Sequence, residues 1–265
     1  MRLYQNLFFL VALAGCVFAQ DLQPVADRLA AQNALFDEQS ESDLRNSPER
    51  ATAIGDYRYN DKLGEYSPAA IAQRERTDRT FLRRLQAIAT TAFSDQDQLS
   101  HDLLVRVLQQ RIADFDLKEY EMPITQQDGI HTDLADLPLS VPFDSVKHYE
   151  DYIARLHQIP RVLSETTEVL RAGINDNLMP VSFLLEKLPD QCQDIINAHP
   201  FLIPTRKYPA GISAEEQKRL TQQITAAIET DVVPAYKRFA AFLRTEYAPH
   251  GRTVLAVTSL PDGEK

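Results

Sequence analysis

The residues whose chemistry could support catalysis are few and widely separated in this sequence. The chain contains no G-x-S-x-G nucleophile elbow, no H-E-x-x-H zinc motif and no glycine-rich phosphate loop, and it has only eight glycines. Its six histidines are scattered: His101, His131, His148, His157, His199 and His250. We therefore assign no catalytic residue and no metal ligand from the sequence.

The best local cluster of metal-binding residue types surrounds His148. Asp151 follows His148 by three residues and Asp144 precedes it by four, so a helix would place all three side chains on one face. A zinc site there would need further ligands from elsewhere in the chain. An exposed, solvated helix surface explains the same pattern, and we favour that interpretation.

The polar loop Gln126–His131 is the strongest candidate for ligand binding. It follows a long predicted helix and precedes a proline-rich segment, and loops often carry binding residues. We predict Gln127, Asp128 and His131 as substrate-binding residues. The alternative is an Asx turn, in which the Asp128 side chain bonds the backbone near Gly129.

The cysteines offer neither a disulfide framework nor a recognisable nucleophile. Cys16 belongs to the amino-terminal segment, and Cys192 is the only cysteine after it. No catalytic signature surrounds Cys192, and unpaired cysteines commonly behave as small buried apolar residues. We interpret Cys192 in that way.

Residues 1–19 have the pattern of a secretory signal peptide. They carry one positive charge at Arg2, then an apolar stretch, then small residues. Cleavage after Ala19 would release a soluble protein, whereas a lipobox ending at Cys16 would attach a lipid to that cysteine. Both readings predict an exported protein, periplasmic or extracellular, whose only route to a membrane is a lipid anchor.

Charge and length narrow the class of protein further. The formal net charge is -10, and loss of Arg2 with the signal peptide makes it -11. An acidic chain is a poor partner for nucleic acid, so we predict no nucleic-acid binding. With 265 residues, 44% of them hydrophobic, the chain can bury a sizeable core.

Serine caps predict a pair of helices in the first half of the chain. Ser67 precedes Pro68 at the first helical position, and Ser94 precedes Asp97 by three residues. Two antiparallel helices joined by a short turn are therefore expected. The apolar residues of the second helix form one stripe, made of Leu99, Leu103, Leu104, Val107, Leu108, Ile112 and Phe115.

Similar signals predict helices in the second half. A helix capped near Ser145 must end or kink at Pro160, and another then runs to Gly173. A capping box at Ser213 opens a helix of about thirty residues, which Pro234 should bend without abolishing. Near the end of the chain, the apolar run Thr253–Val257 is typical of a strand or a buried segment.

These elements predict an all-α fold, an antiparallel helical bundle in two packed layers with long irregular proline-rich connections. We divide the chain into the signal peptide (residues 1–19), an amino-terminal helical layer (20–121), an irregular connection (122–143) and a second helical layer (144–265). Residues 200–211, with three prolines, form a second irregular stretch.

Several segments, in order along residues 35–265, together resemble the bacterial family called domain of unknown function 885. No single segment is specific, but their order and spacing are. The matching segments are Ser47–Thr52 with Gly55, Tyr59–Asp61, Gln127–His131, Tyr149–Tyr152 with Arg155–Leu156, Ile159–Pro160, Arg171–Gly173, Pro180, Pro234–Tyr236, Phe242–Leu243, Tyr247, Arg252 and Leu260–Gly263.

The resemblance implies a mostly helical, exported or lipid-anchored protein similar to zinc metallopeptidases. Members of the family are about twice this long, and in their second half an H-E-x-x-H-like motif binds zinc and activates water. Segment Leu260–Gly263 normally leads into that half, so the chain is expected to be interrupted there. No family catalytic residue transfers to this sequence, and the chain alone is expected to be inactive and to hold no cofactor.

Two functional hypotheses follow. In the first, the chain is the amino-terminal, non-catalytic part of such a protein, forms one wall of a cleft for a peptide substrate and needs a carboxy-terminal catalytic half as its partner. In the alternative, it is a stand-alone periplasmic or surface module that binds a peptide or a protein partner through the Gln127–His131 loop.

Overall fold

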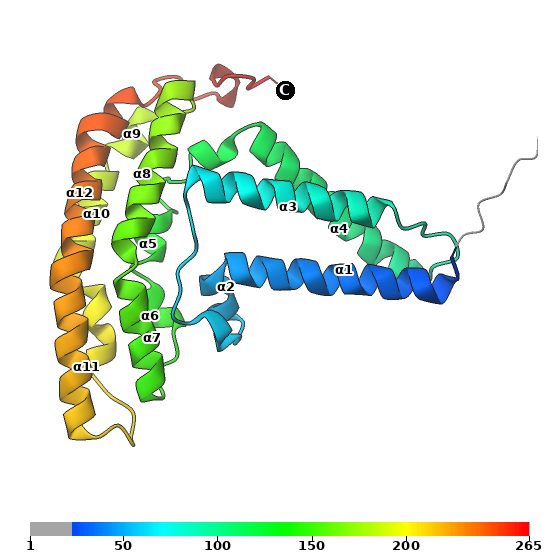
Figure 1. The fold of residues 1–265 in the computed structure, drawn as a ribbon. Helices are drawn as coiled ribbons and strands as arrows, with labels where there is room; N and C mark the ends of the chain where they lie inside the picture. The colour runs from blue at the N-terminus through cyan, green and yellow to red at the C-terminus, as the bar shows by residue number, and fades with distance from the viewer. Residues whose placement is uncertain (1–22, 265) are drawn as a thin grey trace, which may run out of the picture.

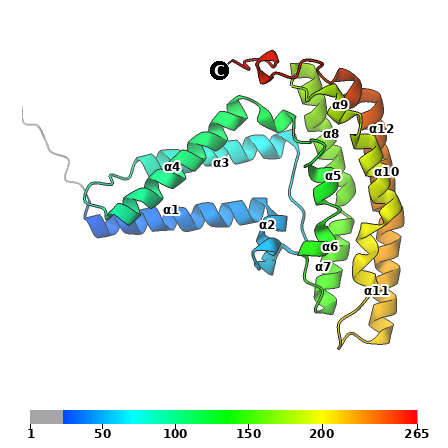
Figure 2. The same ribbon diagram turned by 180° about the vertical axis from the view of Figure 1, so that it is seen from behind.

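The computed structural model describes residues 23–264, which fold into helices with no strand among them. The predicted signal peptide and Cys16 lie outside the described residues. The predicted all-α fold is confirmed, and the helices form two groups whose long axes cross (Figures 1 and 2). We call these two groups the arm and the body.

The arm consists of three long helices that lie side by side: α1 (Val25–Asn46), α3 (Pro68–Gln86) and α4 (Asp95–Asp116). The expected antiparallel pair is α3 and α4 (Figure 1). The core of the arm is small, with a cluster of four buried apolar side chains: Leu35, Phe81, Leu85 and Leu108. The predicted apolar stripe of α4 is only half buried, because Leu99, Leu103 and Val107 are exposed on the outer face.

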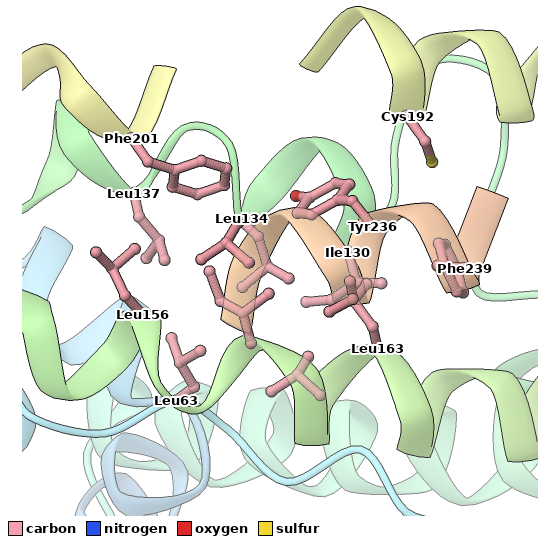
Figure 3. Close-up of a cluster of buried hydrophobic side chains, with 14 of the residues drawn as sticks. Leu63, Ile130, Leu134, Leu137, Leu156, Leu163, Cys192, Phe201, Tyr236 and Phe239 are labelled. Carbon is pink, nitrogen blue, oxygen red and sulfur yellow. The ribbon is translucent and has the colours of Figure 1, made fainter. Parts of the chain in front are cut away.

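The body contains α7 (Val146–Leu156), α8 (Ile159–Asp176), α10 (Leu188–Ala198), α11 (Ala214–Ala227) and α12 (Val233–Phe242). The short helices α5 (Ile130–Asp133) and α6 (Leu137–Ser140) precede α7 in the chain, and α9 (Ser182–Leu185) lies between α8 and α10. Aromatic and aliphatic side chains from distant segments meet in one large core (Figure 3). Helix α2 (Pro48–Ala53) and the segment after it lie where the arm meets the body.

The capping signals read from the sequence correspond to real helix starts. In each case the serine Oγ accepts the backbone N–H three residues further on, at 3.2–3.3 Å. The four capping residues are Ser67, Ser94, Ser145 and Ser213. Each bond satisfies a donor that the first helical turn leaves free, which fixes where the helix begins.

The predicted long helix after Ser213 continues through Pro234. A π-helical turn, Ile228–Val232, separates α11 from α12, and that proline is the second residue of α12. Proline has no N–H for the α-helical ladder, and a wider turn at this point accommodates the missing donor. A second π turn, Leu243–Tyr247, ends the run.

Two sequence predictions are wrong: where one helix ends, and what structure the segment near residue 255 adopts. Helix α8 does not stop at Gly173 but continues to Asp176, where Asn177 adopts a left-handed φ of 57°. The segment Thr253–Val257 forms no strand, and its apolar side chains are exposed. The isolated bridge described next to it joins Val181 to Arg252. Among residues 23–264, no helix combines the length and the apolar character that crossing a membrane requires.

Candidate functional site

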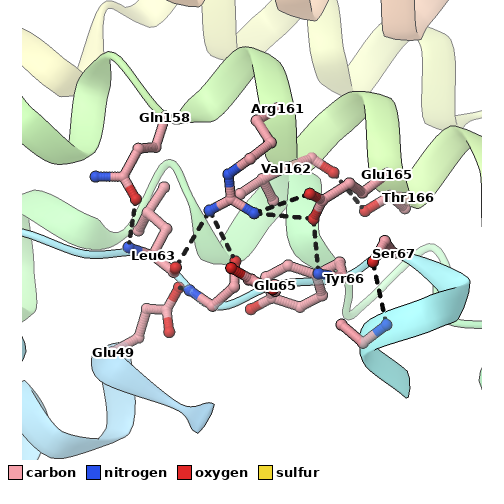
Figure 4. Close-up of polar contacts among 12 residues, drawn as sticks. Glu49, Leu63, Glu65, Tyr66, Ser67, Gln158, Arg161, Val162, Glu165 and Thr166 are labelled. Atoms are coloured by element: carbon pink, nitrogen blue, oxygen red, sulfur yellow. Dashed lines mark hydrogen bonds and ion pairs between the residues drawn. The ribbon is translucent and has the colours of Figure 1, made fainter. Parts of the chain in front are cut away.

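The segment between Asn60 and Ser67 connects α2 to α3 across the face of the body, and we call it the crossing segment; side chains at the start of α8 bind its backbone (Figure 4). The guanidinium of Arg161 pairs with the carboxylate of Glu165 at 2.9 Å and donates to the carbonyl oxygens of Leu63 and Gly64 at 3.2 and 3.1 Å. Glu165 in turn accepts the backbone N–H of Tyr66 at 2.7 Å. One ion pair therefore binds both donors and acceptors of the crossing segment.

Two further side chains hold the same segment. The amide of Gln158 accepts the N–H of Leu63 at 3.0 Å and donates to the carbonyl oxygen of Asp61 at 2.7 Å. From the arm side, Glu49 of α2 accepts the N–H of Gly64 at 3.0 Å. The backbone of the crossing segment is thus paired on both sides, as buried backbone groups require.

Arg155 of α7 is completely buried beneath this junction. Its Nε donates to the carbonyl oxygen of Lys62 at 2.7 Å, and its Nη2 donates to Thr52 Oγ1 at 2.7 Å and to the carbonyl oxygens of Pro48 and Tyr59. Burial lowers the pKa of Arg155 from its usual range. A single body side chain therefore ties α2 and the start of the crossing segment to the body.

A pocket of about 500 Å³ opens at this junction between arm and body. Such a volume lies within the range of small-molecule sites in proteins. Residues of α1, α2, α3, α4, α5 and α8 line it, and Phe115, Tyr120, Ile130 and Val169 supply its apolar surface. The ring of Phe115 stacks on that of Tyr120, with centroids 5.1 Å apart.

Charged side chains of both signs also line the pocket. Arg111 of α4 pairs with both carboxylate oxygens of Asp43 of α1, at 3.0 and 2.8 Å, and lies 3.6 Å from Asp78 of α3. Burial raises the pKa of Asp78, and the positive charge of Arg111 opposes this shift. Arg111 therefore joins all three arm helices at the edge of the pocket.

Arg74 and Tyr66 lie at the pocket without an ionic partner of their own. The Nη1 of Arg74 donates to the carbonyl oxygen of Glu65 at 2.7 Å, and no carboxylate of residues 23–264 forms an ion pair with it. Burial lowers the pKa of Arg74. Burial also raises the pKa of Tyr66, which Asp133 raises further and Arg74 lowers, so the phenol stays protonated near both charges.

Two of the predicted binding residues, Gln127 and Asp128, are exposed on their loop. Their backbone N–H groups donate to the hydroxyl of Thr125 at 3.2 and 3.0 Å. Thr125, rather than the Asp128 carboxylate of the Asx alternative, organises this turn. Neither side chain is among those that line the pocket.

The third predicted binding residue, His131, is completely buried against the body. Its Nε2 lies 3.3 Å from the side-chain oxygen of Gln191, and its carbonyl oxygen accepts the hydroxyl of Tyr236 at 2.7 Å. Burial lowers the pKa of His131. Its neighbours Gly129, Ile130 and Asp133 line the pocket, so the loop does contribute to the site, but through other residues.

The His148 cluster does not assemble a metal site. His148 Nδ1 lies 2.7 Å from Asp144, but Asp151 pairs with Lys147 instead. Residues 23–264 bring together no group of three His, Cys, Asp or Glu side chains that could hold a metal ion. The residues present therefore do not fit zinc, and we derive no step through it.

Cys192 is buried and unpaired, as the sequence predicts. Burial raises the pKa of its thiol to about 12, so the reactive thiolate is scarce at neutral pH. The thiol faces the apolar core near Tyr236 (Figure 3). It packs as a small hydrophobic residue and takes no part in the pocket.

Fold and site together define a class: an all-α protein in which a helical arm and a helical body enclose a pocket at their junction. The family described as "Bacterial protein of unknown function (DUF885)" matches residues 48–265. The chain belongs to this family, which confirms the resemblance seen in the sequence. No curated protein matches it.

A solved structure also resembles the chain. It is described as "The crystal structure of the putative lipoprotein from Colwellia psychrerythraea" and is 16% identical, with a TM-score of 0.77. The match covers 91% of this chain and 45% of that one, so this chain spans less than half the length of its structural neighbour. At this level of identity the likeness shows the fold alone.

Proposed function

We propose that the chain forms one wall of a peptide-binding cleft in an exported protein of the DUF885 family, with the junction pocket as part of that cleft. The observation that carries the proposal is the pocket of about 500 Å³. Aromatic and aliphatic side chains line it together with charges of both signs, which suits a peptide, because a peptide presents apolar side chains, polar backbone groups and charged ends.

Peptide hydrolysis would require groups that residues 23–264 do not provide. The resemblance to zinc metallopeptidases supports a peptide as the ligand, and a carboxy-terminal catalytic half would supply the zinc ligands and the activated water. This chain would then bind and orient the substrate. Adding that half, as a separate polypeptide from a longer family member, should produce zinc-dependent peptidase activity that neither piece shows alone.

The proposal places the protein outside the cytoplasm. The signal-like pattern of residues 1–19 and the description of the structural neighbour as a lipoprotein both support export. A Cys16→Ser variant distinguishes the two export routes, because only a lipid-anchored protein would then leave the membrane fraction. If the chain stays in the cytoplasm in either form, the export proposal fails.

Peptide binding can be measured with a single fluorescent reporter, because the chain contains no tryptophan. A Tyr120→Trp variant places one indole at the pocket, and Phe183→Trp places one on the exposed surface of α9 as the matched control. Titration with alanyl-leucyl-phenylalanine should change the emission of the first variant and leave the second unchanged. Equal responses, or none, would remove the support for a peptide site in this pocket.

The alternative, a stand-alone binding module, is favoured by one feature of the body. Its core is continuous and uses only residues between Leu63 and Tyr247. A stand-alone module should be monomeric and unfold in one cooperative step, whereas half of a larger domain should bind a hydrophobic dye or aggregate through exposed apolar surface. Denaturation and dye binding of the purified chain separate the two cases.

A further inference from the structure

The guanidinium of Arg74 is partly buried at the junction pocket and has no carboxylate partner among residues 23–264. Guanidinium carries five N–H donors, and a partly desolvated cation is costly unless a negative charge compensates it. Only one donor atom of Arg74 is used, by the carbonyl oxygen of Glu65 at 2.7 Å. Its remaining donors are available to a ligand.

The nearby arginines differ from Arg74 in this respect. Arg111 pairs with Asp43, and Arg161 pairs with Glu165 through two hydrogen bonds. Asp43 and Glu165 are therefore paired with other arginines, while Asp78, Glu65 and Glu165 act on Arg74 through their charges without a direct ion pair. Glu75, the neighbour of Arg74 on α3, likewise pairs with Arg79.

A second arginine without an ion pair lines the same pocket. Arg50, the third residue of α2, is exposed, and its guanidinium forms no hydrogen bond or ion pair with the rest of residues 23–264. These two guanidiniums can bind an anionic group, and the apolar surface of Phe115, Tyr120 and Ile130 can bind an apolar body, in a pocket whose lining also includes the carboxylates of Asp114 and Asp133.

We propose that Arg74, assisted by Arg50, binds the terminal carboxylate of a short peptide whose apolar side chain lies against Phe115 and Tyr120. This proposal rests on the proposed function and makes it more specific, because it names the chemical group that is recognised. Arginine suits this task, since its planar fork matches the two oxygens of a carboxylate.

The test uses the full chain and a pair of probes that differ only at the recognised group: N-acetyl-leucyl-phenylalanine and its carboxy-terminal amide. Titration calorimetry should show tighter binding of the acid than of the amide. Arg74→Gln should weaken binding of the acid by at least about tenfold and abolish its advantage over the amide. Arg50→Gln, at an exposed position, should weaken binding of the acid in the same direction.

Arg76→Gln is the matched control, because Arg76 lies on the same helix, bonds Gln73 at 2.7 Å and faces away from the pocket. It should leave both affinities unchanged. Equal binding of acid and amide, or an unaltered affinity in both Arg74→Gln and Arg50→Gln, would overturn carboxylate recognition while peptide binding in the pocket still stands. If neither probe binds at millimolar concentration, the proposed function fails as well.

Discussion

Arginines near the junction act in two different ways. Arg155 is fully buried, and its Nε and Nη2 donate to backbone carbonyl oxygens and the Thr52 hydroxyl, so its role is to hold arm and body together. Arg74 is half-buried and keeps most of its donors free beside a cavity. Both residues are arginines, but only Arg74 has free N–H donors at the pocket, where a ligand can bind them.

Replacing Arg155 with methionine should destabilise the chain strongly. The variant keeps a similar volume but removes the donors to the carbonyl oxygen of Lys62 and to Thr52 Oγ1, at a cost of about 3 kcal/mol or more. Urea denaturation measures this loss. The control Arg244→Met removes only an exposed ion pair with Asp190 and should cost less than about 1 kcal/mol. Similar losses in the two variants would contradict the anchoring role of Arg155.

Burial of His131 should make stability depend on pH. Its pKa in the folded chain lies below the ordinary value of 6.5, so the unfolded chain takes up a proton at a higher pH than the folded chain does. The stability of the folded chain is therefore complete above the ordinary pKa and falls as pH decreases through it. A His131→Gln variant lacks this titration.

Thermal unfolding midpoints of the natural chain and of His131→Gln, measured from about pH 8 to about pH 5, provide the comparison. The midpoint of the natural chain should fall more steeply. The buried His101, whose pKa burial also lowers, contributes equally to both proteins and cancels from the difference. Parallel curves would mean that His131 is accessible to protons, as a substrate-binding residue would be.

The predicted binding residues and the residues that line the pocket come from the same loop but are different side chains. Residue type singled out Gln127, Asp128 and His131, whereas the pocket uses Gly129 and Ile130 from the same stretch. Which side of a loop faces a cavity depends on packing against distant elements, and the local sequence does not contain that information. Of the arginines that line the pocket, only Arg50 belongs to a segment of the family resemblance.

At the level of elements, side-chain caps and prolines predicted helix starts well because both act through local backbone bonds. For example, the caps predicted the start of α3 after Ser67 and the start of α11 after Ser213. Helix α1 was missed because the side chains on its buried face are mostly polar: Arg28, Gln32, Leu35 and Gln39. Apolar periodicity cannot detect such a helix.

Partners distant in the sequence explain why these polar groups are buried in α1. Gln32 bonds His101 at 2.9 Å, and Arg28 donates to the carbonyl oxygen of Thr91 at 3.0 Å. Buried polar groups are stable when they are hydrogen-bonded in this way. Only the folded arm brings these partners together, so the sequence alone could not reveal them.

Gly173 yields a prediction at the same scale. It lies inside α8 at a position where a Cβ would come within 2.5 Å of the carbonyl oxygen of Glu121, so a larger residue does not fit without a backbone shift. Glycine to alanine in a helix is usually stabilising, but Gly173→Ala should destabilise the chain by about 1–3 kcal/mol because the backbone of residues 119–121 must move. Chemical denaturation measures the change. A gain in stability would show that this close contact is absent in solution.

For the whole molecule, the unequal sizes of the two cores predict unequal local stability. The arm core has four buried apolar residues, and the body core has many more. Local opening is easier where few apolar contacts are lost. Amides of α1, α3 and α4 should therefore exchange with solvent at a lower opening free energy than those of α8 and α12.

A Leu85→Ala variant sharpens this comparison. Leu85 belongs to the arm core, so its truncation should speed exchange throughout the arm and leave α8 and α12 at the rate of the natural chain. Acceleration of both parts to the same extent would mean that arm and body unfold as one cooperative unit.

The central claim is that a peptide binds where the arm meets the body. Hydrogen–deuterium exchange of the unaltered chain, with and without a saturating concentration of alanyl-leucyl-phenylalanine, tests it most directly. Peptide binding should protect α2, the first turns of α3 and residues 129–133, all of which contribute to the pocket. Protection confined to other parts of the chain, or no protection at all, would contradict it.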